Sequence, residues 1–120
     1  MAPHDLEVSV RDRDGVAIID LVGEINSAAG PALERAYREA AHGRTAVVLN
    51  FTRTDYINST GIALIVWLLA EARTRGIPIT ACGLSDHYRE IFEITRLADF
   101  MRITDNEDGA VTGAEGSHHA

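Results

Sequence analysis

The sequence contains no lysine, and all eleven of its basic residues are arginine. This absence excludes a P-loop lysine, a Schiff-base lysine and a lysine general base, and with them several classes of enzyme. The single cysteine, Cys82, excludes an internal disulfide and a cysteine-rich zinc site, so we expect an inert buried thiol there. The sequence predicts no metal site and no bound cofactor.

Long apolar runs are also missing. The longest, residues 61–70, is about half of the roughly 18 residues that a membrane-spanning helix needs, so no membrane insertion is predicted. The N-terminus lacks the apolar core of a signal peptide, which together with the lone cysteine favours a cytoplasmic protein. The net charge of −7 argues against nucleic acid as a partner, because phosphates require a basic surface.

The acidic charge is concentrated at the C-terminus. Residues 105–120 contain four acidic side chains, no arginine and few large apolar groups. We therefore expect residues 1–108 to form one domain and residues 109–120 to form a flexible, Gly-rich acidic tail. His118 and His119 lie in this tail and do not by themselves indicate a metal site.

The remaining residues alternate between strand and helix patterns. Asp14-Gly15 predicts a hairpin turn between the first two strands. Strands are predicted at residues 6–11, 16–22, 45–51, 77–83 and 101–104, and helices at about 31–43, 59–75, from Ser85 or Asp86 onward, and in a short segment at 97–100. This order predicts an α/β fold with a mixed sheet of four to five strands and about four helices packed on it.

The start of the helix at Ser59 contains the strongest candidates for functional residues. Asn58 and Ser59 are both favourable N-cap residues. The free amides and dipole of a helix N-terminus favour negative charge by about 0.3–1 kcal/mol, and a phosphoryl group on Ser59 would add nearly two negative charges. The spacing is thus compatible with a phosphorylation switch and does not establish one.

The same helix lacks a polar face over residues 62–70. Two interpretations remain open, because the helix is either buried all round or presents part of its apolar surface to a partner. We expect Trp67 to lie in the core.

Three motifs together resemble a known family. They are Val-Gly-Glu-Ile-Asn at 22–26, Asn-Ser-Thr-Gly-Ile at 58–62, and Arg-Glu-Ile-Phe-Glu-Ile-Thr-Arg-Leu at 89–97. In this order and spacing, residues 6–108 resemble a STAS domain of the type found in bacterial anti-sigma factor antagonists. The resemblance implies a STAS fold and a protein that is not an enzyme.

The resemblance also implies partners and site residues. An unphosphorylated antagonist binds an anti-sigma factor that is also a serine kinase, phosphorylation releases it, and a PP2C-type phosphatase reverses the modification. The implied phosphoacceptor is Ser59, supported by Asn58, Thr60 and Gly61. The implied partner surface comprises Glu24, Asn26, Ser27 and Ile62, and a weak homodimer is compatible with the family.

Asn58 and Asn26 depart from this resemblance, because the family usually has Asp at both positions. The change lowers the negative charge expected near Ser59, and it removes carboxylates that a kinase could recognise. A non-phosphorylated scaffold or adaptor in a stress-signalling or membrane-transport complex is therefore an alternative. A hydrolase with Ser59 as nucleophile would need His42 or His87 as base, and no Gly-x-Ser-x-Gly elbow surrounds Ser59.

Overall fold

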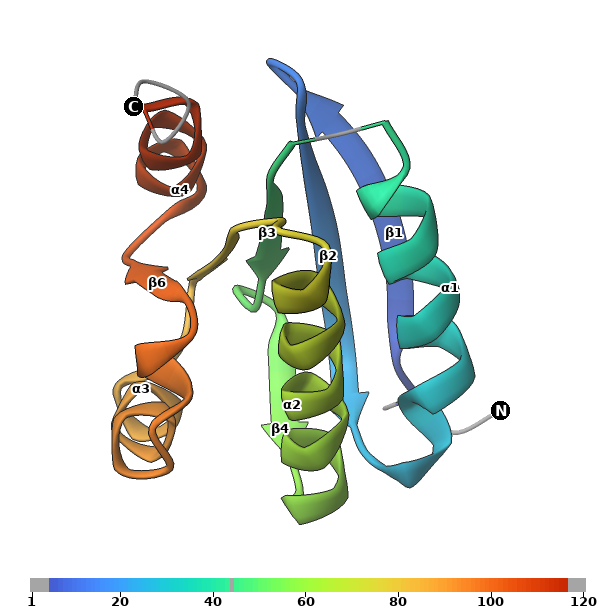
Figure 1. Cartoon of the computed structure of the whole chain (residues 1–120). Helices are drawn as coiled ribbons and strands as arrows, with labels where there is room; N and C mark the ends of the chain where they lie inside the picture. Colours follow the sequence, from blue (N-terminus) through green and yellow to red (C-terminus); the bar gives the residue numbers. More distant parts are fainter. Residues whose placement is uncertain (1–4, 44, 117–120) are drawn as a thin grey trace.

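The computed structural model describes residues 5–43 and 45–116 and contains a mixed sheet of six strands (Figure 1). The strands are β1 (Glu7–Arg13), β2 (Val16–Ile25), β3 (Val47–Asn50), β4 (Thr54–Ile57), β5 (Ile79–Cys82) and β6 (Arg102–Thr104). The sheet order is β1-β2-β3-β5-β6, with β4 also pairing with β2. Only the β1–β2 pairing is antiparallel among these strands. The predicted α/β fold with a mixed sheet is confirmed, with six strands instead of four to five.

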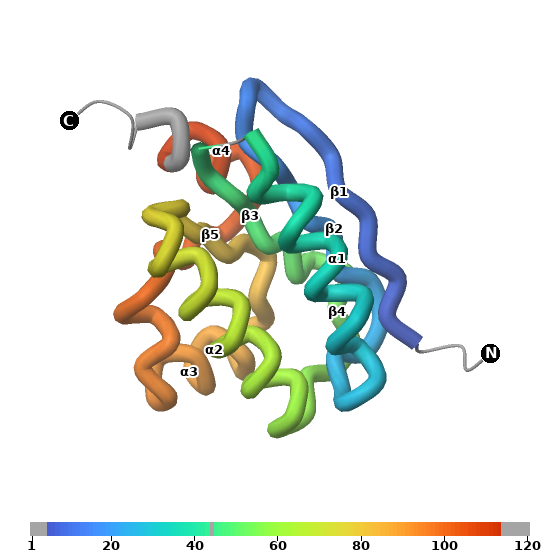
Figure 2. The backbone as a smooth tube through the Cα atoms, turned by 45° about the vertical axis from the view of Figure 1, so that its right-hand side comes forward, coloured from blue at the N-terminus to red at the C-terminus, as the bar shows by residue number. Residues whose placement is uncertain are grey.

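Four α-helices of the described part of the chain cover the sheet from both sides. The helices α1 (Gly30–Ala41), α2 (Ser59–Thr74) and α3 (Asp86–Ile94) contribute to the larger core, and α1 and α2 lie side by side in front of the sheet (Figure 2). Short 3-10 helices occupy Ser27–Ala29 and Leu97–Asp99. The fourth helix, α4 (Glu107–Gly116), closes a smaller core with β2, β3 and β5.

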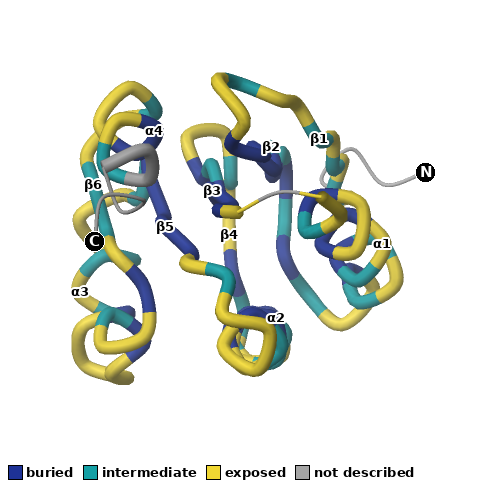
Figure 3. The backbone as a smooth tube through the Cα atoms, turned by 45° about the horizontal axis from the view of Figure 1, so that its top comes forward, coloured by how far each residue is buried: buried dark blue, intermediate teal, exposed yellow. Residues whose placement is uncertain are grey.

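The central strands are buried on both faces, as their continuous apolar sequence predicts (Figure 3). Successive side chains of a strand point to opposite faces. In β2, Ala17, Ile19 and Leu21 belong to the larger core. Val16 and Ile18 belong to the smaller core, together with Cys82 of β5. The predicted burial of the Cys82 thiol is therefore confirmed, and burial raises the pKa of this thiol to about 11.

The strand β4 lies where the sequence predicts only a polar loop. Thr54–Ile57 pairs in parallel with the end of β2, with Glu24 opposite Tyr56 and Ile25 opposite Ile57. Asp55 and Tyr56 are exposed, and Ile57 is buried. A strand with so few apolar residues has a weak sequence signal, and here the backbone pairing with the long β2 holds it in place.

The predicted tail boundary at residue 109 needs correction. Residues from Glu107 to Gly116 form α4, and Ala110 and Val111 are buried in the smaller core. Asn106 accepts a hydrogen bond from the Gly109 amide at 2.9 Å, and this bond caps the helix start. The acidic side chains of the first turn pair with arginines of β1: Glu107 with Arg11 and Arg13, and Asp108 with Arg13. Residues 117–120, with His118 and His119, lie outside the described residues.

Candidate functional site

The N-terminus of α2 presents Ser59 to solvent. Asn58 is the N-cap residue, and its Oδ1 accepts a hydrogen bond from the Gly61 amide at 2.8 Å. Ser59 and Thr60 occupy the first two helical positions, and both are exposed. Because Asn58 does the capping, the Ser59 hydroxyl is not needed for that role. A modification of this hydroxyl would leave the cap hydrogen bond in place.

Gly61 brings this helix start against the end of β2. A Cβ at Gly61 would lie 2.1 Å from the carbonyl oxygen of Ile25, a separation that real Cβ atoms do not reach. The Asn58 amide donates to this same oxygen at 3.2 Å. The position therefore requires glycine, and the backbone of β2 fixes the place of Ser59.

The loop after β2 lies beside Ser59 because β2 and β4 are paired. A register shift between Gly23 and Glu24 interrupts the pairing, which resumes with Glu24 opposite Tyr56, and Gly23 has a φ of 109°. Asn26 caps the 3-10 helix that follows, with its Oδ1 accepting from the Ala28 amide at 2.9 Å. Glu24 and Asn26 are half-buried, and Ser27 is exposed. The structure thus brings the predicted partner-surface residues of this loop next to Asn58 and Ser59.

Tyr88 supports the candidate site and was not predicted from the sequence. Its ring is half-buried in α3 and packs against the larger core. Its hydroxyl oxygen accepts a hydrogen bond from the Ile57 amide at 2.9 Å. The bond ties α3 to the residue directly before the Asn58 cap. Sequence pattern cannot reveal it, because the contact joins residues far apart in the chain.

The apolar helix has one buried side and one open side. Ile65, Leu68, Leu69 and Ala72 are buried, whereas Ala63, Val66 and Ala70 are exposed and Ile62 is half-buried. Trp67 is half-buried and packs edge-to-face on Tyr37 with 6.2 Å between the ring centroids, so it contributes to the core as expected. The interpretation that this helix is buried all round is therefore wrong, and a partner on its open side stays a prediction.

The histidines do not build a nucleophile site with Ser59. His87 is exposed and packs against Tyr88, and His42 is the C-cap of α1, far from the start of α2 in Figure 1. Within the described residues, no hydrogen bond joins Ser59 to a histidine. The same part of the chain holds no cluster of three or more potential metal-ligating His, Cys, Asp or Glu side chains. None of its helices is long and apolar enough to cross a bilayer.

Comparison with known proteins identifies the relatives of this chain. Residues 7–110 match the family described as the STAS domain. The anti-sigma-B factor antagonist of Listeria monocytogenes is 32% identical over 110 residues, which cover 90% of this chain and 94% of that protein. The crystal structure of an anti-sigma factor antagonist from Mycobacterium paratuberculosis is similar with a TM-score of 0.77 and 25% identity, covering 95% of this chain and 97% of that one.

The fold alone occurs with other functions. The crystal structure of a sulfate transporter family protein from Wolinella succinogenes has a TM-score of 0.78 at 18% identity, covering 90% of this chain and 91% of that one. At this identity the similarity concerns the fold. The family match over most of the sequence, the mixed sheet and the placement of Asn58, Ser59 and Gly61 agree with one another. The chain belongs to the STAS domain family.

Proposed function

We propose that this chain is an anti-sigma factor antagonist in a partner-switching pathway. The unphosphorylated form binds an anti-sigma factor that is a serine kinase, and phosphorylation of Ser59 releases it. A PP2C-type phosphatase restores the binding form, and the antagonist itself catalyses no reaction. The observation that carries this proposal is an exposed Ser59 at a helix start that Asn58 already caps. The names of the relatives from Listeria and Mycobacterium support the same role.

Electrostatics explains how one phosphate could act as a switch. The amides of the α2 N-terminus favour an anion, so the phosphoryl group does not destabilise its own helix. It adds between about 1.5 and 2 negative charges at pH 7. Ser59 lies next to the open apolar side of α2, where a partner would exclude water. A charge there opposes close apolar contact and repels acidic groups of the partner.

The two asparagines near Ser59 fit this switch. Asn26 and Asn58 each use a side-chain oxygen to cap a helix start, and an aspartate could make the same hydrogen bonds. The neutral amides leave the site without two carboxylates that would repel a phosphate. Phosphate formation at Ser59 is therefore electrostatically easier than beside two aspartates.

Phosphorylation by purified kinase tests the proposal. Each anti-sigma factor kinase of the source organism is incubated with the chain, ATP and Mg²⁺, and intact mass is measured. We expect the wild-type chain to gain one phosphoryl group, Ser59→Ala to gain none, and the matched control Thr60→Ala to gain one. Phosphate on the Ser59→Ala variant would contradict the assignment of Ser59.

A constitutive adaptor role is the second candidate function. The open side of α2 exists without any modification, which favours an interface that does not depend on phosphate. The similarity to a sulfate transporter family protein agrees with this role at the level of the fold. In that case, Ser59→Asp would leave the affinity for the partner unchanged in calorimetry. The switch instead predicts that Ser59→Asp lowers the affinity at least tenfold.

A further inference from the structure

The side of α2 that carries Ser59 is open along the whole helix. Ser59, Ala63, Val66, Ala70 and Arg73 follow one another at spacings of four and three residues, and all five are exposed. This spacing places them on one line along the helix surface. With a rise of 1.5 Å per residue, the line from the first to the last is about 21 Å long.

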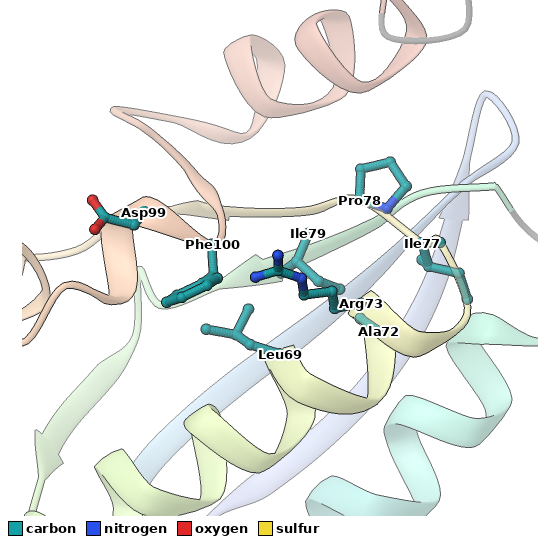
Figure 4. A pocket seen from close by; sticks show the side chains of 9 residues that line it. Leu69, Ala72, Arg73, Ile77, Pro78, Ile79, Asp99 and Phe100 are labelled. Carbon is teal, nitrogen blue, oxygen red and sulfur yellow. The ribbon is translucent and has the colours of Figure 1, made fainter.

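An apolar groove runs beside the second half of this line. One wall comes from α2, with Val66, Leu69, Ala70 and Arg73, and the other comes from Thr95, Leu97 and Phe100. The groove encloses about 290 Å³. A second cavity of about 450 Å³ shares Leu69, Arg73 and Phe100 with it and continues to Pro78 (Figure 4).

Two large apolar side chains that line the groove remain exposed, Val66 at 46% and Phe100 at 53%. The described residues contain two other large exposed hydrophobic side chains, Tyr56 and Ile94, and neither lines this groove. Single exposed apolar residues are common on proteins, but here two of the four line one apolar groove. A concentration of this kind is typical of a surface that a partner covers.

The charge of the groove indicates which charged group a partner would place there. The Arg73 guanidinium lies over the Phe100 ring, with 5.2 Å from its central carbon to the ring centroid. Arg73 makes no ion pair with a carboxylate among the described residues. Asp99, which lines the second cavity, is instead paired with Arg96 at 2.8 Å. The uncompensated charge of the groove is therefore positive, and its complement is a carboxylate.

We propose that a helix of the anti-sigma factor kinase lies along α2 and fills this groove. One of its apolar side chains enters the cavity between Val66 and Phe100, and one of its carboxylates pairs with Arg73. A helix fits because the exposed line is straight, and the small Ala63 and Ala70 let a second backbone approach closely. A segment of about 14 residues would reach from Ser59 to Arg73.

This inference rests on the proposed function and adds to it. A phosphate on Ser59 would stand at the start of the same line, where its bulk and charge would oppose close approach of the partner helix. The groove would then supply the affinity of the complex, and Ser59 would control it. The two contributions can be separated, because the groove residues lie two or more turns away from Ser59.

Binding of the kinase that phosphorylates Ser59 tests the groove. We expect Val66→Asp and Arg73→Glu each to lower the affinity at least tenfold in calorimetry, and Phe100→Ala to lower it at least fivefold. Two controls carry matched charge changes outside the groove: Thr74→Asp on α2, and Arg35→Glu on α1. Both are expected to bind within twofold of wild type. Circular dichroism melting confirms that each variant is folded.

The outcomes separate the groove from the switch. If Val66→Asp and Phe100→Ala bind the kinase with wild-type affinity while Ser59→Asp binds more weakly, the proposal that the groove binds the kinase is wrong. The proposed function then still stands. Variants that bind the kinase normally but lose a self-association seen by light scattering assign the groove to a second copy of the chain, which also overturns the proposal. Failure of every kinase to bind wild-type chain overturns both proposals.

Discussion

At the residue scale, two residues, Gly61 and Asn58, decide how Ser59 is presented. Gly61 lets the start of α2 touch the carbonyl oxygen of Ile25, and Asn58 caps the helix. The N-cap hydrogen bond does not involve Ser59, which is exposed at the first helical position. Tyr88 adds a third restraint by accepting a hydrogen bond from the Ile57 amide.

We expect Gly61→Ala to lower the free energy of unfolding by about 3 kcal/mol, because the added Cβ forces the helix away from β2. Urea unfolding at pH 7 measures the change. Gly30→Ala is the matched control, since a Cβ there meets only the Leu64 side chain at 3.5 Å, an ordinary contact. The control should be neutral or slightly stabilising. Equal stability of the two variants would contradict the close approach at Gly61.

At the element scale, α4 is held by little apolar surface and several charges. Among its described side chains, only Ala110 and Val111 are buried, and its first turn pairs with Arg11 and Arg13 of β1. Partly exposed ion pairs contribute about 0–1 kcal/mol each. We therefore expect α4 to open locally at a lower free energy than the central sheet.

Cys82 reports this opening, because its thiol lies in the small core that α4 covers. We predict that Glu107→Gln speeds labelling of Cys82 by Ellman's reagent about fivefold at pH 8, since it weakens the pairs with Arg11 and Arg13. Glu34→Gln is the control, because its partner Arg38 lies on α1 and not near α4. Labelling of both variants at the wild-type rate would show that α4 does not open alone.

At the scale of the whole molecule, one charge cluster joins the first hairpin to the last helix. Arg11 donates to Asp20 at 2.5 Å and to Glu107 at 2.6 Å, and Asn50 of β3 donates to Asp20 at 2.8 Å. The hydrogen bond from Arg11 is the main reason that the pKa values of Asp20 and Glu107 lie below their ordinary values. Residues from β1, β2, β3 and α4 therefore interact in one cluster, which contributes to the stability of the fold as a unit.

The sign of the pH dependence follows from these shifts. Each carboxyl group binds a proton less readily in the folded chain than in the unfolded chain, so the cluster stabilises the fold above the ordinary pKa values of 3.8 and 4.5. Its contribution is lost as the pH falls through and below this range. We predict that Glu107→Gln reduces the fall in unfolding free energy between pH 7 and pH 3.5. Urea unfolding at several pH values measures this fall in free energy. The control Glu90→Gln on α3 should show the same fall as the wild-type chain.

Much of the fold could be predicted because its patterns are local. The apolar strands predicted at residues 16–22 and 45–51 are confirmed as β2 and β3, with somewhat different ends, and the Asp14-Gly15 turn and the helix starting at Ser59 are confirmed as well. The strand β4 and the helix α4 could not be predicted, because neither has a sufficient apolar pattern of its own. Backbone pairing with β2 holds the first, and contacts with Val16, Ile18 and the arginines of β1 hold the second.

The sequence by itself determined the family, the α/β class and the candidate residues around Ser59, because these depend on neighbouring residues and their spacing. Only the tertiary structure decided which residue caps α2, why Gly61 must be glycine, and which side of the apolar helix is open. It also brought Arg73 and Phe100 together across a groove. The reason is physical: burial and contact depend on how distant segments pack, and local pattern does not contain that information.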